Sequence, residues 1–153
     1  NWLGDLWAKR LIQKEKKKLD EEIESYKVKL KKSEFIFQKE FEAASELVGL
    51  IRSFLPKYNH PQMDWYEACD EIAHNFHKIE LRLDDYLSTH GAVLNENVID
   101  LISACIAIAG DTKFEITSPE VPKLANDAAN ALYGELKKAE KIVLQQVHSQ
   151  SST

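Results

Sequence analysis

The sequence predicts an all-α protein, with a long N-terminal amphipathic helix that is coiled-coil-like in its first half and runs into a roughly four-helix bundle. Apolar residues recur at steps of three and four along most of the 153 residues. Only 5 Gly and 4 Pro occur, which is too few for the many turns of a strand-rich fold. Hydrophobic residues make up 44% of the chain and charged residues 29%, which is typical of a globular protein.

The first helix is predicted from about Trp2 to Leu55, because Pro56 cannot continue it. Its apolar positions have the spacing of one helix face, close to a heptad seam. They are Leu19, Ile23, Tyr26, Leu30, Phe37, Phe41, Ala44, Val48, Ile51 and Leu55. Near Ser33 a thin seam gives way to a broad apolar face. We therefore expect a basic juxtamembrane stalk helix at 1–32, a helical bundle domain at 33–148 and a disordered tail at 149–153.

A second helix is predicted over 64–90, with Asp64 as its N-cap and Gly91 as a left-handed C-terminal cap. A third is predicted over 95–109, capped by Asn95 and ending before Gly110. This third helix is apolar nearly all round. We therefore expect it in the middle of the bundle or under a partner.

The loop 110–118 is expected to be turn-rich, with Phe114 and Ile116 in a short extended piece. Ser118 followed by Pro119 is a favourable helix start, because proline suits the first helical position. The fourth helix is therefore predicted over 119–148.

Charge is unevenly distributed along the chain. Residues 1–32 hold ten Lys/Arg and six Asp/Glu, whereas residues 33–153 hold ten and nineteen. An acidic bundle repels phosphates. The lysine run at 14–18 is followed by the acidic stretch 20–24, which can pair with it along the helix, and no aromatic residue interrupts the run. We expect no nucleic-acid partner.

The N-terminal ten residues combine tryptophan with positive charge. Trp2 and Trp7 precede Lys9 and Arg10, a pattern typical of a membrane interface on its cytoplasmic side. The chain begins with Asn1 rather than Met, so we expect a transmembrane helix before it to have been removed. That places the protein at the cytoplasmic face of the bacterial inner membrane, near anionic lipid. The alternative is a soluble cytoplasmic helix whose tryptophans contact a protein partner.

The segment WLGDLW followed by KEKKKLDEEIESYKVKL resembles bacterial membrane-tethered proteins of unknown function. In these proteins a short membrane helix and a Trp-rich junction lead into a charged helical stalk. The resemblance covers residues 1–32 and implies a tethered stalk with a cytoplasmic domain. It implies no activity.

Residues with possible chemistry are few. Glu71 and His74 have the Glu-x-x-His spacing of di-iron bundles, and His77 lies one turn further on. Such sites need a second Glu-x-x-His, which the chain lacks, so we expect no metal site and no cofactor. Cys69 and Cys105 lie in apolar helical patterns, which predicts buried, reduced thiols. No nucleophile elbow or phosphate-binding loop occurs, and we expect no catalytic residues.

The resulting hypothesis is a non-catalytic assembly module that forms a homo-oligomer through the seam of its first helix and docks an unknown protein partner. The seam residues are Leu19, Ile23, Tyr26 and Leu30. One alternative is a ligand- or effector-sensing helical domain, with a pocket lined by the third helix and by aromatic residues. These aromatic residues are Phe37, Phe41, Trp65, Tyr66 and Phe76. The other alternative is a metal protein or enzyme that uses Glu71, His74 and His77.

Overall fold

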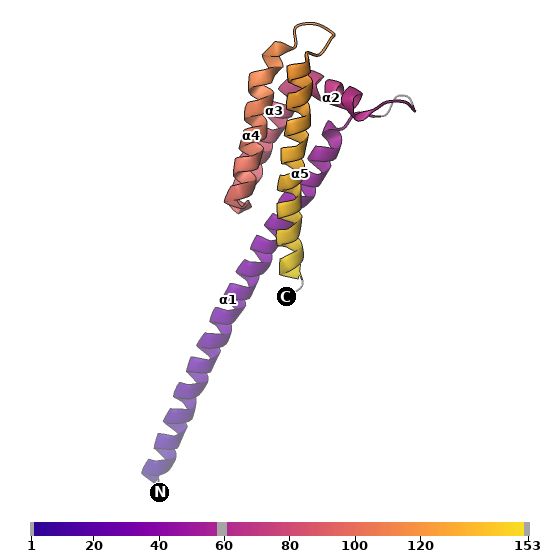
Figure 1. Cartoon of the computed structure of the whole chain (residues 1–153). Helices are drawn as coiled ribbons and strands as arrows, with labels where there is room; N and C mark the ends of the chain where they lie inside the picture. Colours follow the sequence, from indigo (N-terminus) through magenta and orange to yellow (C-terminus); the bar gives the residue numbers. More distant parts are fainter. Residues whose placement is uncertain (1, 58–60, 152–153) are drawn as a thin grey trace. The chain divides into compact units, whose positions relative to one another are not determined.

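The computed structural model describes residues 2–57 and 61–151, and it confirms the all-α fold. Within these ranges there is no strand. The elements in order are α1 (Trp2–Phe54), α2 (Trp65–His74), α3 (Phe76–His90), the short 3₁₀ helix η1 (Gly91–Val93), α4 (Glu96–Thr112), the 3₁₀ helix η2 (Lys113–Glu115) and α5 (Lys123–Ser151) (Figure 1).

The chain forms two compact units, and the division falls inside α1 between Gln38 and Lys39. We call residues 1–38 the N-terminal segment and residues 39–153 the bundle. The N-terminal segment is a single helix whose side chains are almost all exposed. The bundle contains the last third of α1 and all of the other elements.

The core of the bundle lies where the apolar stripes of its helices meet. α4 packs between α3 and α5, and α2 packs against α5. The largest fully buried side chains are Leu47, Ile51, Ile72, Phe76, Ile79, Leu83, Val98, Ile102, Leu132 and Leu136. Alanines separate them, and those at 43, 44, 68, 73, 109, 125, 129 and 139 are also buried. Small residues at these positions let neighbouring helix backbones approach closely, since an alanine adds little volume between them.

The prediction of one helix over 64–90 is wrong, because the chain breaks at Asn75 into α2 and α3. The start is confirmed: the Asp64 side chain accepts a hydrogen bond from the Glu67 N–H at 2.9 Å. At the break, Asn75 Nδ2 donates to the Glu71 carbonyl oxygen at 2.9 Å. Asparagine competes with the helix by bonding nearby backbone groups, which is the physical reason for a break that the apolar stripe does not reveal.

The prediction that a helix ends at His90 with Gly91 as its C-cap is confirmed, but the predicted left-handed conformation is wrong. Gly91 has φ −54° and ψ −32°, so it is right-handed and continues into η1. The prediction that a helix ends before Gly110 is also wrong. α4 is capped by Asn95, as predicted, through its side chain and the Asn97 N–H at 2.8 Å, but it runs through Gly110 to Thr112. The absence of a side chain at Gly110 makes room for Glu80, because a Cβ there would lie 3.0 Å from Glu80 Oε1.

The last helix begins later than predicted. α5 starts at Lys123, and the carbonyl of Pro122 accepts from the N–H groups of Ala125 and Asn126. Ser118 and Pro119 lie in the preceding bend, and the expected extended piece around Phe114 is instead η2. α5 runs to Ser151, so the helix covers the first part of the predicted tail, while residues 152–153 lie outside the described residues.

The burial predicted for α4 is only partly confirmed. Val98, Ile102, Cys105 and Ala109 are buried along one stripe. The opposite face, which carries Ser103, Ala104 and Ala107, is exposed. α4 therefore has the ordinary two-faced character of a bundle helix.

Candidate functional site

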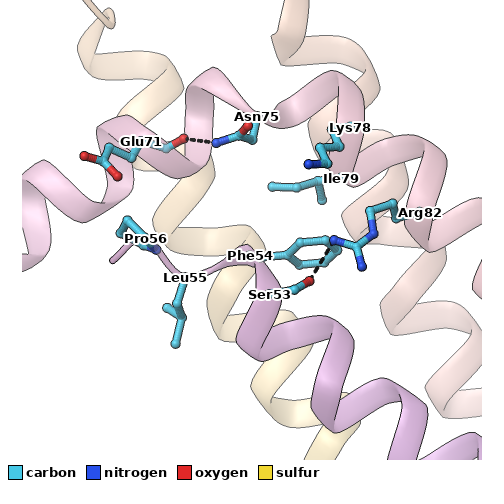
Figure 2. A pocket seen from close by; sticks show the side chains of 9 residues that line it. All are labelled: Ser53, Phe54, Leu55, Pro56, Glu71, Asn75, Lys78, Ile79 and Arg82. Carbon is cyan, nitrogen blue, oxygen red and sulfur yellow. Dashed lines mark hydrogen bonds between the residues drawn. The ribbon is translucent and has the colours of Figure 1, made fainter. Parts of the chain in front are cut away.

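A partly enclosed pocket of the bundle lies where the end of α1 meets α2 and α3 (Figure 2). It has a volume of about 230 Å³. Its lining residues are Ser53, Phe54, Leu55, Pro56, Glu71, Asn75, Lys78, Ile79 and Arg82. Two local sequence features build it. Pro56 lies two residues after the end of α1, and the break at Asn75 begins α3 beside that end.

Arg82 is held across this pocket by residues of α1. Its Nη1 donates to Ser53 Oγ at 2.8 Å, and its guanidinium carbon lies 5.6 Å from the centre of the Phe54 ring. Ser53 in turn donates to the Leu50 carbonyl oxygen at 2.6 Å. Figure 2 shows Lys78 on the same helix, one turn before Arg82. Lys78 makes no ion pair with the described residues.

The chemistry available in the pocket is binding rather than covalent catalysis. Two cationic side chains and one hydroxyl can receive a small anionic group, and Glu71 is the single carboxylate in the lining. The Ser53 hydroxyl has a guanidinium and a backbone carbonyl as its neighbours. Neither can take its proton, so the arrangement lacks the base that an activated serine needs.

The fold does not bring the side chains of Glu71, His74 and His77 together as a set of metal ligands. His74 and His77 are exposed, and the break at Asn75 lies between them. Asp70, which would share their face on a continuous helix, accepts from Asn126 Nδ2 of α5 at 2.7 Å. No group of three His, Cys, Asp or Glu that could hold a metal ion occurs in the described part of the chain.

Both cysteines are free and buried, as predicted. Burial, assisted by the Asp70 charge, raises the pKa of Cys69. Burial and the Glu135 charge raise the pKa of Cys105 to about 12. A thiol with a raised pKa carries little thiolate at neutral pH, and the thiolate is the nucleophile. Neither cysteine is therefore suited to nucleophilic chemistry.

A second polar cluster links α1 and α3 inside the bundle. The Tyr86 hydroxyl donates to the Ala43 carbonyl oxygen at 2.6 Å, and His90 Nε2 pairs with the Glu46 carboxylate. Burial, with the Glu46 charge as the smaller cause, raises the pKa of Tyr86. This cluster is structural in character, because it joins two elements and opens only onto a shallow hollow.

The aromatic residues expected to line a sensing pocket do not line the pocket of Figure 2. Phe76 is in the core, and Phe41 is exposed. Trp65 packs on Tyr133 of α5 with ring centres 5.0 Å apart and donates to Asn130 at 2.8 Å. The pocket residues Ser53, Lys78 and Arg82 were missed. Lys78 and Arg82 lie one turn apart on α3, but Ser53 of α1 meets Arg82 only through a tertiary contact that no spacing along the chain reveals.

The predicted oligomerisation residues are all exposed on the N-terminal segment. Leu19, Ile23, Tyr26 and Leu30 keep between 44% and 67% of their surface accessible. The membrane-proximal candidates are exposed too: Trp2 at 76%, Trp7 at 73%, and Lys9 and Arg10 with them. In the described residues, no helix is both long enough and apolar enough to pass through a membrane.

Comparisons with known protein families, with curated proteins and with solved structures give no match to this chain. The resemblance of residues 1–32 to tethered stalk proteins therefore remains an expectation.

Proposed function

We propose that this protein is a non-catalytic assembly module that self-associates through the seam of its N-terminal segment. The observation that carries the proposal is the exposure of Leu19, Ile23, Tyr26 and Leu30 at coiled-coil spacing. Exposed apolar residues are ordinary when scattered singly, but a continuous stripe of them is typical of an interaction surface.

The seam also has the composition of a helix-pairing surface rather than of a core. Charged side chains flank the four residues on both sides, as in coiled coils, where they set partner and orientation. A lone helix of this composition gains little from burial, since its stripe contacts nothing but water. Covering the stripe with a second helix removes apolar surface from water at roughly 25 cal/mol per Å².

The test is the absolute mass of the full chain in solution, measured by light scattering over a wide range of protein concentrations. We expect a dimer that dissociates on dilution. Ile23→Asp, which places a charge in the seam, should give a monomer. Val28→Asp is the control, because Val28 is also an exposed apolar residue of the same helix but lies outside the seam. A wild-type monomer at every concentration, or equal effects of both variants, would refute the proposal.

A second candidate function, membrane attachment, is favoured by the exposure of Trp2 and Trp7 beside Lys9 and Arg10. We propose that this end of the protein contacts an anionic membrane surface, in keeping with a place at the cytoplasmic face of a bacterial inner membrane. Tryptophan favours the interface, and each basic residue near an anionic surface contributes about 1 kcal/mol.

The test is co-sedimentation of the full chain with vesicles that contain anionic lipid. Replacing Lys9 and Arg10 with Glu should reduce binding strongly. The same change at Lys31 and Lys32 is the control, because it removes the same charge at the other end of the segment. Equal loss in both variants would indicate unspecific attraction and would contradict a contact at the tryptophan end.

The alternative of a ligand-sensing domain is supported by the cationic pocket of the bundle. Its test is a thermal shift of the full chain with inorganic phosphate and small carboxylates, compared between wild type and Lys78→Gln. Stabilisation that disappears in the variant would favour sensing. No stabilisation by any of these anions would count against it.

A further inference from the structure

The N-terminal segment carries one heptad register over residues 12–37. Its apolar core positions are Ile12, Leu19, Ile23, Tyr26, Leu30 and Phe37. Two polar residues interrupt the register, Lys16 and Ser33. When two of these helices pair, each of these two polar residues needs a compatible residue of the partner opposite it. The charged residues that flank the core also need partners of opposite sign. These two requirements distinguish parallel from antiparallel pairing.

In a parallel pair, each core residue faces its own copy. Lys16 then faces the partner's Lys16, which buries two like charges in the seam. Of the flanking positions, Glu15 lies beside the partner's Asp20, and both are negative. The attractive pairs further along, such as Glu22 with the partner's Lys27, offset only part of this cost.

In an antiparallel pair centred between Glu24 and Ser25, the core matches throughout. Leu19 faces the partner's Leu30, Ile23 faces Tyr26, and Ile12 faces Phe37. Lys16 faces the partner's Ser33, so the two interruptions meet each other and the lysine has a hydroxyl beside it. Every apolar core residue then lies opposite an apolar one.

The flanking charges match in the same arrangement. Asp20 lies beside the partner's Lys27, and Glu22 lies beside the partner's Lys29, each twice by symmetry. No flanking pair has like charges. In the single chain, Lys27 makes only an exposed contact with Glu24 at 3.7 Å, and the other three form no ion pair with described residues.

Shifting the antiparallel pair by one heptad in either direction removes this match. With the centre moved to Glu21, Asp20 meets the partner's Asp20 and Glu22 meets Glu22. With the centre moved to Val28, Lys27 and Lys29 each meet their own copies. Charge therefore favours one register out of three.

We infer that two copies of the chain pair antiparallel through residues 12–37, with the two-fold axis between Glu24 and Ser25. This inference rests on the proposed self-association and adds its orientation and register. The flanking ion pairs lie at the edge of the seam, so their role is to select the arrangement, while the apolar residues supply most of the affinity.

Disulfide trapping in the full chain tests the orientation. Leu19→Cys and Leu30→Cys are prepared separately, oxidised under native conditions, and then mixed and oxidised together. In the antiparallel pair the two copies of residue 19 are eleven residues apart along the axis, roughly 16 Å, which is too far for a disulfide. Each variant alone should therefore stay uncrosslinked, and the mixture should give a covalent dimer.

A covalent dimer from Leu19→Cys alone would overturn the antiparallel arrangement while leaving self-association intact. A wild-type monomer in light scattering, with no crosslinking in any sample, would instead overturn the proposed function. Val28→Cys is the control for random collision, because residue 28 lies on the outer face, and it should crosslink in neither arrangement.

The charge variant Asp20→Lys is an independent test, because it should weaken an antiparallel dimer and strengthen a parallel one. In the antiparallel pair it replaces attraction to the partner's Lys27 with repulsion, so the dimer should dissociate at a several-fold higher concentration. In a parallel pair it would replace repulsion from Glu15 with attraction, and the dimer would tighten. Adding Lys27→Asp to this variant should restore the antiparallel dimer.

Discussion

The hydrogen bond from Tyr86 to Ala43 connects two helices of the bundle, and removing it gives a prediction that can be worked out in detail. Tyr86 is 2% exposed, and its hydroxyl lies 2.6 Å from the Ala43 carbonyl oxygen. Tyr86→Phe fills the same space without the hydroxyl. The Ala43 carbonyl is also an acceptor within its own helix, so it is not left unsatisfied. The cost should therefore be that of one net hydrogen bond, about 1 kcal/mol.

The assay is urea unfolding of the full chain at neutral pH, followed by circular dichroism. We expect the free energy of unfolding to fall by about 1 kcal/mol, with an unchanged dependence on urea. Tyr66→Phe is the control, since Tyr66 is more than half exposed, and its effect should stay within about 0.5 kcal/mol. A loss above about 3 kcal/mol would mean that the ring itself is displaced, and our account of the contact would be refuted.

At alkaline pH, Tyr86→Phe should become more stable than the wild-type protein. Burial and the Glu46 charge raise the pKa of Tyr86 in the folded protein, while the phenol of the unfolded chain has a pKa of about 10. The unfolded chain then loses this proton first, so wild type loses up to about 1.4 kcal/mol of stability per pH unit above about 10. Tyr86→Phe has no such proton, so the difference in free energy of unfolding between wild type and this variant should narrow with rising pH and then change sign. A gap that stays constant through about pH 11 would contradict the burial of the phenol.

Four further predictions concern the bundle. Gly134→Ala should stabilise it by about 0.5–1 kcal/mol, because nothing lies within 4 Å of the added Cβ in a helix interior. Gly110→Ala should gain less or lose stability, since its Cβ would displace the Glu80 carboxylate from its ion pair with Lys113; urea unfolding measures both. Leu136→Ala should cost about 2–5 kcal/mol in the same assay, as its side chain is fully buried. Cys105 should react with a thiol reagent at neutral pH only as fast as the bundle opens, which the urea dependence of labelling would report.

Each of these has a result that would contradict it. Equal effects of alanine at the two glycines would mean that Glu80 does not need the space at Gly110. Leu124→Ala, at an exposed position of α5, is the control for Leu136→Ala, and a similar cost at both would argue against the described face of α5. Rapid labelling of Cys105 without denaturant would show that its site is accessible.

The sequence predicts best those features that are local. Asp64 and Asn95 cap helices because their short polar side chains reach the nearest free N–H groups, and Pro56 follows a helix end because of its ring. The stripes at steps of three and four locate the core only in part, because Ala44 and Ile51 of the first predicted stripe are buried whereas Phe41 and Leu55 are exposed. All of these signals act within one or two turns of the chain, so spacing alone reveals them.

The features that sequence reasoning missed depend on contacts between distant residues. Gly110 lies inside α4 at a point where a Cβ would meet the Glu80 carboxylate, and these two residues are far apart in the chain. The pocket likewise depends on Ser53 and Arg82, which meet only once α1 and α3 are packed. The break at Asn75 was missed because the apolar stripe continues through it, and the stripe outweighed the weaker signal of an asparagine.

The exposed tryptophans lie at only one end of α1. Whether two copies pair parallel or antiparallel therefore affects how the pair can attach to a membrane. Two parallel helices would bring both tryptophan ends to the same membrane and could stand upright on it. Antiparallel helices point these ends in opposite directions, so an upright pair could attach through one copy only. Attachment of both copies would then require the paired helices to lie along the lipid surface, or each end to reach a different membrane.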